Sequence, residues 1–297
     1  APLDLLSSES GKYVLLNAHL HPVSGPDIAK GTLIIEDGKI TALGAEVDYQ
    51  EVGAKVIDLN GLHVYPGLID AGTTLGLTEI GRVKETSDYS ESGDFQADLR
   101  AGVGINPDSE LIPVSRAGGI TTILAQPKSG LISGQASLIK LHGWTTPQMT
   151  IDLEAALRIN WPRGENEKKI DSLNDFFAEA EVYRDAKVTA LKKEQAILKD
   201  PRYEAMLPYL AGEKPVLIEA HARKEIVEAV TFAEEHQLKL ILGGAGDAWK
   251  VAEELRKRDI PVILGPVMER PLESWDPYDA PYANAGRLHA AGVRFCI

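Results

Sequence analysis

Apolar, strand-like runs alternate with amphipathic helical stretches after Gly61, and this alternation restricts the fold of the 297-residue chain more than any other feature. It indicates a parallel sheet wrapped by helices. Helices are expected where apolar residues recur every three or four positions, at 172–193, 224–235 and 248–258. Strands are expected at 64–70, 121–126, 137–141, 216–220, 239–242, 261–264 and 293–297.

The segment before Gly61 has a different pattern, made of short β-rich runs separated by turn signals. Asp37-Gly38 is a hairpin signal between two of these runs. A small antiparallel sheet is therefore expected from runs at 13–16, 31–35, 39–43 and 55–59. We expect a first domain at 1–62 and a larger second domain at 63–297.

Composition excludes several classes of partner. A formal net charge of -13 would repel a phosphate backbone, so no nucleic acid is expected to bind. No apolar run reaches the roughly 18 residues of a membrane span, and the single Cys296 cannot form an internal disulfide. The sequence starts at Ala1 without Met and has a polar lead at 7–12, so either an export signal was removed or the sequence given simply begins there. Removal of a signal is preferred, so a periplasmic or secreted location is expected, with the cytoplasm as the alternative.

Several motifs resemble the amidohydrolase superfamily. Gly-Lys-Ile-Thr-Ala-Leu-Gly at 38–44 and Tyr-Pro-Gly-Leu-Ile-Asp-Ala at 65–71 are similar to its opening, and 117–122 is similar to the start of its second strand. Pro-Val-Leu-Ile-Glu-Ala-His at 215–221 resembles the fifth strand of the imidazolonepropionase-like and dihydroorotase-like branches. The resemblance implies a (β/α)8 TIM barrel of the metal-dependent hydrolase type, with a small β-sandwich domain. It also implies hydrolysis of carbon–nitrogen bonds other than peptide bonds, with cyclic amides among the candidate substrates.

The sequence departs from this family at its metal site. Members usually carry His-x-His where this chain has Gly72, Thr73 and Thr74, and the matching sixth strand at 242–247 has no histidine. Of the expected histidine ligands only His221 remains, so the site holds one divalent metal such as Zn, or none. The alternative is a catalytically inactive binding or scaffold protein on the amidohydrolase fold.

The segment 291–297 resembles the eighth strand, after which the family's catalytic aspartate and last helix would follow. An open apolar face costs about 25 cal/mol per Å², so a second polypeptide is expected to complete the barrel and the sandwich. A homo-oligomer of such units is also expected. Cleavage at this point could create an N-terminal Ser or Thr nucleophile, but nicking or truncation is the preferred interpretation.

His221 and Asp247 are the candidate catalytic residues. His221 follows a buried strand, which places it at the face of a barrel where active sites lie, although a hydrogen-bonded structural histidine remains an alternative. Asp247 could carry a proton or cap the helix that follows it, and the cap is preferred. Alternation directs Glu219 and Arg223 the same way as His221, either to orient a small-molecule substrate or to form an interior ion pair.

The remaining candidates for substrate binding are Thr73, Thr74, Glu79, Gln126 and Trp249. The first three occupy the place of the lost metal site and could equally be turn formers. The glycine-rich loop at 129–135 lacks the lysine of a phosphate loop, and the polar segment 76–106 is a candidate substrate lid.

The other histidines are assigned no chemistry. His19 and His21 have the spacing of metal ligands, but alternation places both on one face of the small sheet, where a surface role is preferred. Structural roles are expected for His63, His142, His236 and His289.

Overall fold

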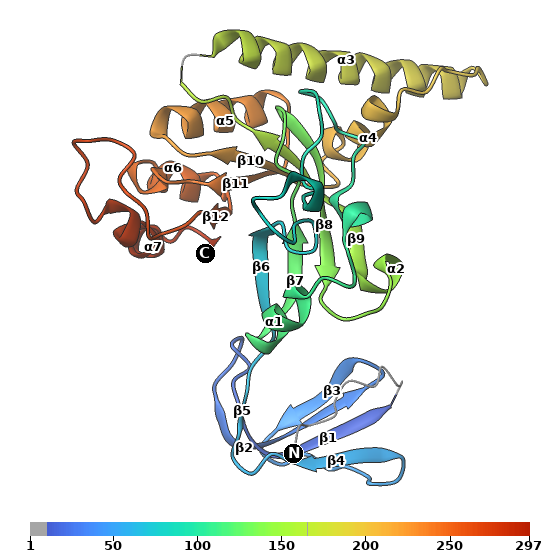
Figure 1. Cartoon of the computed structure of the whole chain (residues 1–297), viewed down its shortest axis with the longest axis vertical. Coiled ribbons are helices and arrows are strands. Elements are labelled where there is room, and N and C mark those ends of the chain that lie inside the picture. Colours follow the sequence, from blue (N-terminus) through green and yellow to red (C-terminus); the bar gives the residue numbers. More distant parts are fainter. Residues whose placement is uncertain (1–10, 165) are drawn as a thin grey trace. The chain divides into compact units, whose positions relative to one another are not determined.

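The boundary between the small sheet and the barrel-like part falls between Gly67 and Leu68. The computed structural model describes residues 11–164 and 166–297, which form these two units (Figure 1). Each unit has its own sheet and its own apolar core.

The first unit is a mixed five-stranded sheet. Its strands are β1 (Lys12–Leu20), β2 (Ile28–Glu36), β3 (Lys39–Gly44), β4 (Ala54–Asp58) and β5 (His63–Val64). The order is β3-β2-β1-β4, with β5 also pairing with β1. The expected hairpin joins β2 to β3, with positive φ at Asp37 and Gly38. The sheet is not wholly antiparallel, because β4 and β5 run parallel to β1.

The second unit contains an eight-stranded, barrel-like sheet whose strands follow one another in sequence order from β6 to β13. The strands are β6 (Leu68–Thr73), β7 (Ile120–Ala125), β8 (Ile132–Lys140), β9 (Thr150–Asn160), β10 (Val216–Ala220), β11 (Leu240–Gly244), β12 (Val262–Leu264) and β13 (Phe295–Cys296).

The sheet curls so that its inner face closes on itself. Side chains from β7 to β12 meet in one small cluster around Leu217, with Ala136 and Ala156 among them. The edges β6 and β13 also approach each other. Burial raises the pKa of the Cys296 thiol on β13, and the negative charge of Asp70 on β6 adds to this rise.

One strand departs from the expected all-parallel barrel. β8 runs antiparallel to both β7 and β9, whereas the other neighbouring strands are parallel. The connections at 126–131 and 141–149 are shorter than the dozen or more residues that a parallel crossover requires. The chain must therefore reverse direction at each of them.

Helices cover the outer face of this sheet. The α-helices are α1 (Leu111–Ala117), α2 (Thr146–Met149), α3 (Glu167–Lys192), α4 (Pro201–Leu210), α5 (Arg223–Glu235), α6 (Ala252–Lys257) and α7 (Ala280–Ala291). The 3-10 helices are η1 (Lys84–Thr86), η2 (Ala101–Gly104) and η3 (Ala248–Lys250). Among the described residues, none of the helices combines the length and the apolar character that crossing a bilayer requires.

Strand alternation divides β10 between two environments. Val216 and Ile218 face outward into the main core, where Phe177 of α3 meets Phe232 of α5 at 5.0 Å between ring centroids. Leu217 faces the inner cluster, and Glu219 shares its side of the strand. The interior of the barrel is therefore apolar around Leu217 and polar near the carboxyl end of β10.

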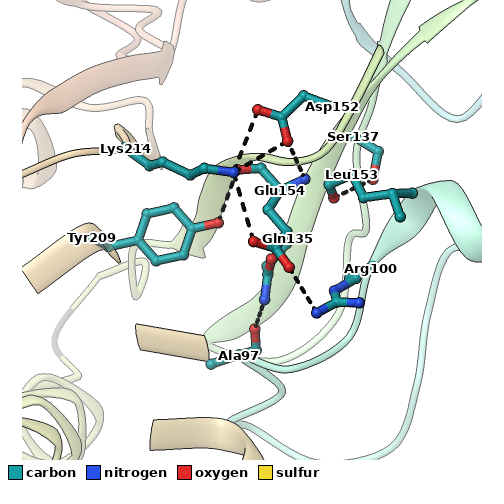
Figure 2. A network of polar contacts seen from close by, with 9 residues as sticks. All are labelled: Ala97, Arg100, Gln135, Ser137, Asp152, Leu153, Glu154, Tyr209 and Lys214. Carbon is teal, nitrogen blue, oxygen red and sulfur yellow. Dashed lines mark hydrogen bonds and ion pairs between the residues drawn. The ribbon is translucent and has the colours of Figure 1, made fainter. Parts of the chain in front are cut away.

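A polar network surrounds the first residues of β9, at the end of the strand opposite its carboxyl end (Figure 2). Lys214 Nζ lies 3.2 Å from Asp152 Oδ1 and 3.6 Å from Glu154 Oε2, while Arg100 Nη2 lies 2.7 Å from Glu154 Oε1. The hydroxyl of Tyr209 on α4 donates to the carbonyl of Glu154 at 3.3 Å. This network ties α4 and η2 to the sheet. It lies at the end of the barrel where strands begin, and residues at that end usually serve stability rather than catalysis.

Three expectations stay predictions: the second half of a β-sandwich, a polypeptide that completes the barrel, and a homo-oligomer.

The main core gives the first testable prediction. Phe177 is fully buried, so Phe177→Ala should lower the free energy of unfolding by about 3–5 kcal/mol, because it leaves a cavity between α3 and α5. Val182 lies in the same helix but is 69% exposed, so Val182→Ala should change stability by less than about 0.5 kcal/mol. Urea unfolding of both variants checks this, and similar losses would contradict the assigned packing.

Candidate active site

A pocket of about 320 Å³ opens at the carboxyl ends of β10, β11 and β12. Catalytic residues of barrel enzymes gather at this end of the strands. The pocket brings together three of the residues singled out in the sequence, His221, Asp247 and Trp249. Its other lining residues include Arg163, Glu225, Gly244, Arg270 and Asn284.

A row of polar contacts links His221 to the carboxylate of Glu219 and then to the guanidinium of Arg158. His221 Nε2 lies 3.3 Å from Glu219 Oε1, and Glu219 Oε2 accepts a hydrogen bond from Arg158 Nη2 at 3.1 Å. The exposed fraction of the side chain rises from 6% at Arg158 to 24% at His221. The row of contacts therefore runs from the buried guanidinium of Arg158 to the imidazole of His221 at the pocket.

Electrostatic interactions keep the carboxyl group of Glu219 ionised. Burial alone would raise the pKa of Glu219, but the hydrogen bond with His221 and the charge of Arg158 outweigh it, and the net pKa is lowered. Burial lowers the pKa of Arg158, and the charge of Glu219 opposes that shift. Arginine stays protonated in proteins, so the pair is a carboxylate and a guanidinium.

Two neighbours fix the position of the imidazole. Gly244 has a φ of 74°, and a Cβ added there would lie 2.6 Å from Cε1 of His221. The ring can therefore rest on the backbone of β11 only because residue 244 is a glycine. Glu225 Oε2 accepts hydrogen bonds from the backbone N–H groups of His221 and Ala222 at 3.0 and 3.1 Å, which holds the turn after β10.

Asp247 caps a helix, but not the one expected. Its side chain makes no capping hydrogen bond to η3, which follows it. Instead Oδ2 accepts from the backbone N–H of Arg223 at 3.1 Å, at the start of α5, and Oδ1 lies 3.0 Å from Lys250 Nζ. Burial would lower the pKa of Lys250, but its bonds to Asp276 and Asp247 raise it overall. Asp247 is thus held by structural contacts.

Alternation predicted that Arg223 faces the interior of the barrel, and this prediction is wrong. β10 ends at Ala220, and Arg223 is the first residue of α5, where its side chain is exposed. The period of two applies only while the backbone is extended. Trp249 does line the pocket, and its ring lies 4.2 Å from Cζ of Arg287.

The candidates on β6 and β7 lie behind or away from the pocket. Gln126 is buried, accepts from Arg158 Nη1, and donates through Nε2 to the carbonyl of Ala71 at 2.7 Å. Thr73 Oγ1 accepts from Leu75 N at 3.2 Å, as a turn former does, and Thr74 lies half-buried just beyond β6.

Glu79 holds a loop. Its two carboxylate oxygens accept from Asn106 Nδ2 at 3.1 Å and Ser109 Oγ at 3.0 Å. None of the three, Thr73, Thr74 or Glu79, is among the described residues that line the His221 pocket.

Among the described barrel residues, the positions expected to hold a divalent metal lack a suitable set of donors. Gly72 has no ligand atom, threonine is a poor ligand beside imidazole, and Glu219 already pairs with Arg158. In the described part of the chain, the group of three or more His, Cys, Asp or Glu side chains close enough to share an ion lies in the first unit. The remaining barrel histidine of the expected set, His221, stands beside Glu219, whose negative charge is already paired with Arg158.

Two residues of the site, one behind the pocket and one lining it, escaped the sequence reasoning. Arg158 lies on β9, which had not been placed; its only signal was a charge inside the apolar run 155–159. Asn284 of α7 is buried, and its Nδ2 donates to the carbonyls of Ala245 and Gly246 at 3.0 and 3.1 Å. Its Oδ1 is buried and has no hydrogen-bond partner among the described residues.

No protein-family model matches the chain. A D-hydantoinase from Geobacillus stearothermophilus is 44% identical over 75 residues, which are 25% of this chain and 15% of that protein. An imidazolonepropionase from Cupriavidus taiwanensis is 33% identical over 134 residues, 44% of this chain and 31% of that protein. The matched stretches thus span less than a third of either relative.

Among solved structures, an amidohydrolase from Thermotoga maritima MSB8 superposes with a TM-score of 0.86 at 24% identity. The match covers 96% of this chain and 77% of that structure. This similarity concerns the fold.

The contact between Gly244 and His221 gives a second prediction. Gly244→Ala should displace the imidazole and destabilise the protein by about 1–2 kcal/mol, because the new methyl group meets the ring and L-residues disfavour positive φ. Gly286 on α7 has no atoms within 4 Å of an added Cβ, so Gly286→Ala is the matched control. Thermal unfolding and the NMR signals of His221 report the outcome, and an unmoved ring in Gly244→Ala would contradict the geometry.

The Arg158–Glu219 pair predicts a pH dependence. Because the pKa of Glu219 is lowered by folding, its ionised form stabilises the protein above its unfolded pKa, and this contribution is lost as the pH falls through the folded value. Arg158→Met removes the cation, so the pKa of Glu219 should rise and stability should be lost at a higher pH than in the unaltered protein.

Urea unfolding at a series of pH values measures this shift. Arg158→Lys, which keeps a positive charge, should move the profile less than Arg158→Met. Identical profiles for the two variants would show that the pair does not set the pKa of Glu219.

Proposed function

We propose that this chain is a member of the amidohydrolase superfamily and that it hydrolyses carbon–nitrogen bonds other than peptide bonds, with cyclic amides as the substrate class. The observation that carries the proposal is the Glu219–His221 pair at the mouth of the pocket. Support also comes from the named activities of its relatives, a hydantoinase and an imidazolonepropionase. Since the matched stretches are short, the activity of the whole protein is part of the proposal.

His221 acts as the general base in this scheme. Glu219 accepts the Nε2–H proton of the imidazole, which leaves the lone pair on Nδ1. Nδ1 takes a proton from a water molecule as the water oxygen bonds to the amide carbonyl carbon. When the carbon–nitrogen bond breaks, His221 returns this proton to the leaving nitrogen, and Glu219 stabilises the imidazolium formed in between.

The other pocket residues bind and polarise the substrate. Asn284 shapes the wall of the pocket, where its amide nitrogen is held by the carbonyls of Ala245 and Gly246. The cationic side chains of Arg163 and Arg270 line the same pocket and stabilise the negative charge that develops on the carbonyl oxygen. The volume of about 320 Å³ suits a small heterocycle with a short substituent.

No step of this scheme passes through a metal, because the donor set of the barrel does not fit one. The substitution of the family's histidines by Gly72, Thr73 and Thr74 is accompanied by the internal cation Arg158, which fixes the carboxylate behind His221. Metal-independent hydrolysis is therefore the form of the activity that the residues favour.

Turnover of a panel of hydantoins and imidazolone propionates tests the proposal. His221→Gln should lower kcat/KM by about 10²–10⁴-fold, as loss of a general base does. Exposed His289 lies on α7, and His289→Gln should leave the rate unchanged. Prior dialysis against a chelator should also leave it unchanged.

Loss of activity on chelation would contradict the metal-independent scheme. Absence of turnover on the whole panel, with ligands still bound in the pocket, would instead favour the alternative of an inactive binding or scaffold protein.

A further inference from the structure

Three histidines meet on one face of the small sheet. β1 and β5 pair in parallel with His19 opposite His63, and the backbone N–H of His21 donates to the carbonyl of Val64 at 2.9 Å. Alternation puts His21 on the same face as His19, while Ala18 and Leu20 face the apolar core of this unit. The imidazole of His19 lies 4.6 Å from that of His21 and 4.5 Å from that of His63, between ring centroids.

The hydrogen bonds of His21 define where its protons lie. Nδ1 of His21 is 2.8 Å from Asp27 Oδ2, and a carboxylate can only accept, so Nδ1 carries the proton. In the neutral ring Nε2 then presents a lone pair, and it lies 2.7 Å from Nδ1 of His63. The proton between these two nitrogens belongs to His63. One shared proton thus occupies the point at which two imidazoles converge.

We propose that His19, His21 and His63 form a binding site for a divalent transition metal ion, with Zn²⁺ as the reference ion. One nitrogen from each residue already lies within 4.8 Å of the other two. Zn–N bonds of about 2.0–2.1 Å place tetrahedral ligand atoms about 3.4 Å apart. The three rings are stacked, with angles of 9°, 18° and 12° between their planes, so they must rotate out of this stack before their in-plane lone pairs can converge on one ion. His63 must also shift its proton to Nε2.

The surroundings of the cluster are those of a histidine metal site. Asp27 accepts from the non-ligating nitrogen of His21, the arrangement that commonly orients a metal-bound imidazole. The ring of Tyr65 stacks on His21 at 4.2 Å between centroids, with only 3° between the planes, and limits its rotation. Three neutral imidazoles suit Zn²⁺, Ni²⁺ or Cu²⁺ rather than Mg²⁺ or Ca²⁺.

The bound ion would cross-link β5 to the rest of the sheet in the first unit. β5 has only two residues, and it precedes Gly67, where the unit ends. An ion held by His63, by His19 of β1 and by His21 just beyond β1 would fasten this short strand to the sheet, because metal binding free energy adds to folding. This role does not depend on the activity proposed for the barrel.

Titration of the chelator-treated full chain with Zn²⁺, followed by calorimetry, tests the site. One equivalent per chain should bind, and His21→Gln and His63→Gln should each weaken binding at least tenfold. Asp27→Asn should weaken it about tenfold, because it removes only the orienting carboxylate. His289→Gln and His221→Gln should bind as the unaltered chain does.

Diffraction from crystals of the unaltered chain grown with Zn²⁺ gives a test that needs no variant. An anomalous peak bounded by the three imidazoles supports the site. A peak only in the barrel, loss of binding with His221→Gln alone, or no saturable Zn²⁺ binding would each overturn the proposal.

Discussion

A buried positive charge inside the barrel is the constraint on which the second unit depends. The guanidinium of Arg158 is almost fully enclosed, and a buried charge is tolerated only when it is paired and hydrogen-bonded. Glu219 supplies the charge and Gln126 supplies a carbonyl oxygen, while Gln126 also reaches the backbone of Ala71. Satisfying one side chain of β9 therefore connects it with β10, β7 and β6. The same pairing fixes Glu219, and Glu219 in turn holds His221.

Much of this architecture could be predicted from sequence because it depends on local patterns. The apolar runs that became β10 and β11 were expected within two residues of their observed bounds, and His221 was expected just beyond a strand. The reversal of β8 was missed, since it follows from the length of two connections rather than from residue pattern. Arg223 was misplaced because alternation was extended past the end of its strand.

The contacts that define the site could not be predicted, because they join residues far apart in sequence. Asp247 caps a helix that begins 24 positions earlier, and Arg158 meets a carboxylate 61 positions later. Local propensity describes how each residue fits its own element and says little about such partners. A charge within an apolar run, as at Arg158, is the one local sign that a distant partner must exist.

Parallel pairing of neighbouring strands assembles both polar clusters, but the partner residues give them different properties. Glu219 on β10 lies opposite Gly243 on β11, and the absent side chain leaves room for the carboxylate to reach Arg158 and His221. In the first unit His19 lies opposite His63, so imidazole meets imidazole. Such rings repel when they are protonated, whereas neutral ones can stack and can share a proton or bind an ion. The barrel therefore carries its own internal cation, whereas the small sheet presents the donors that can accept one from solution.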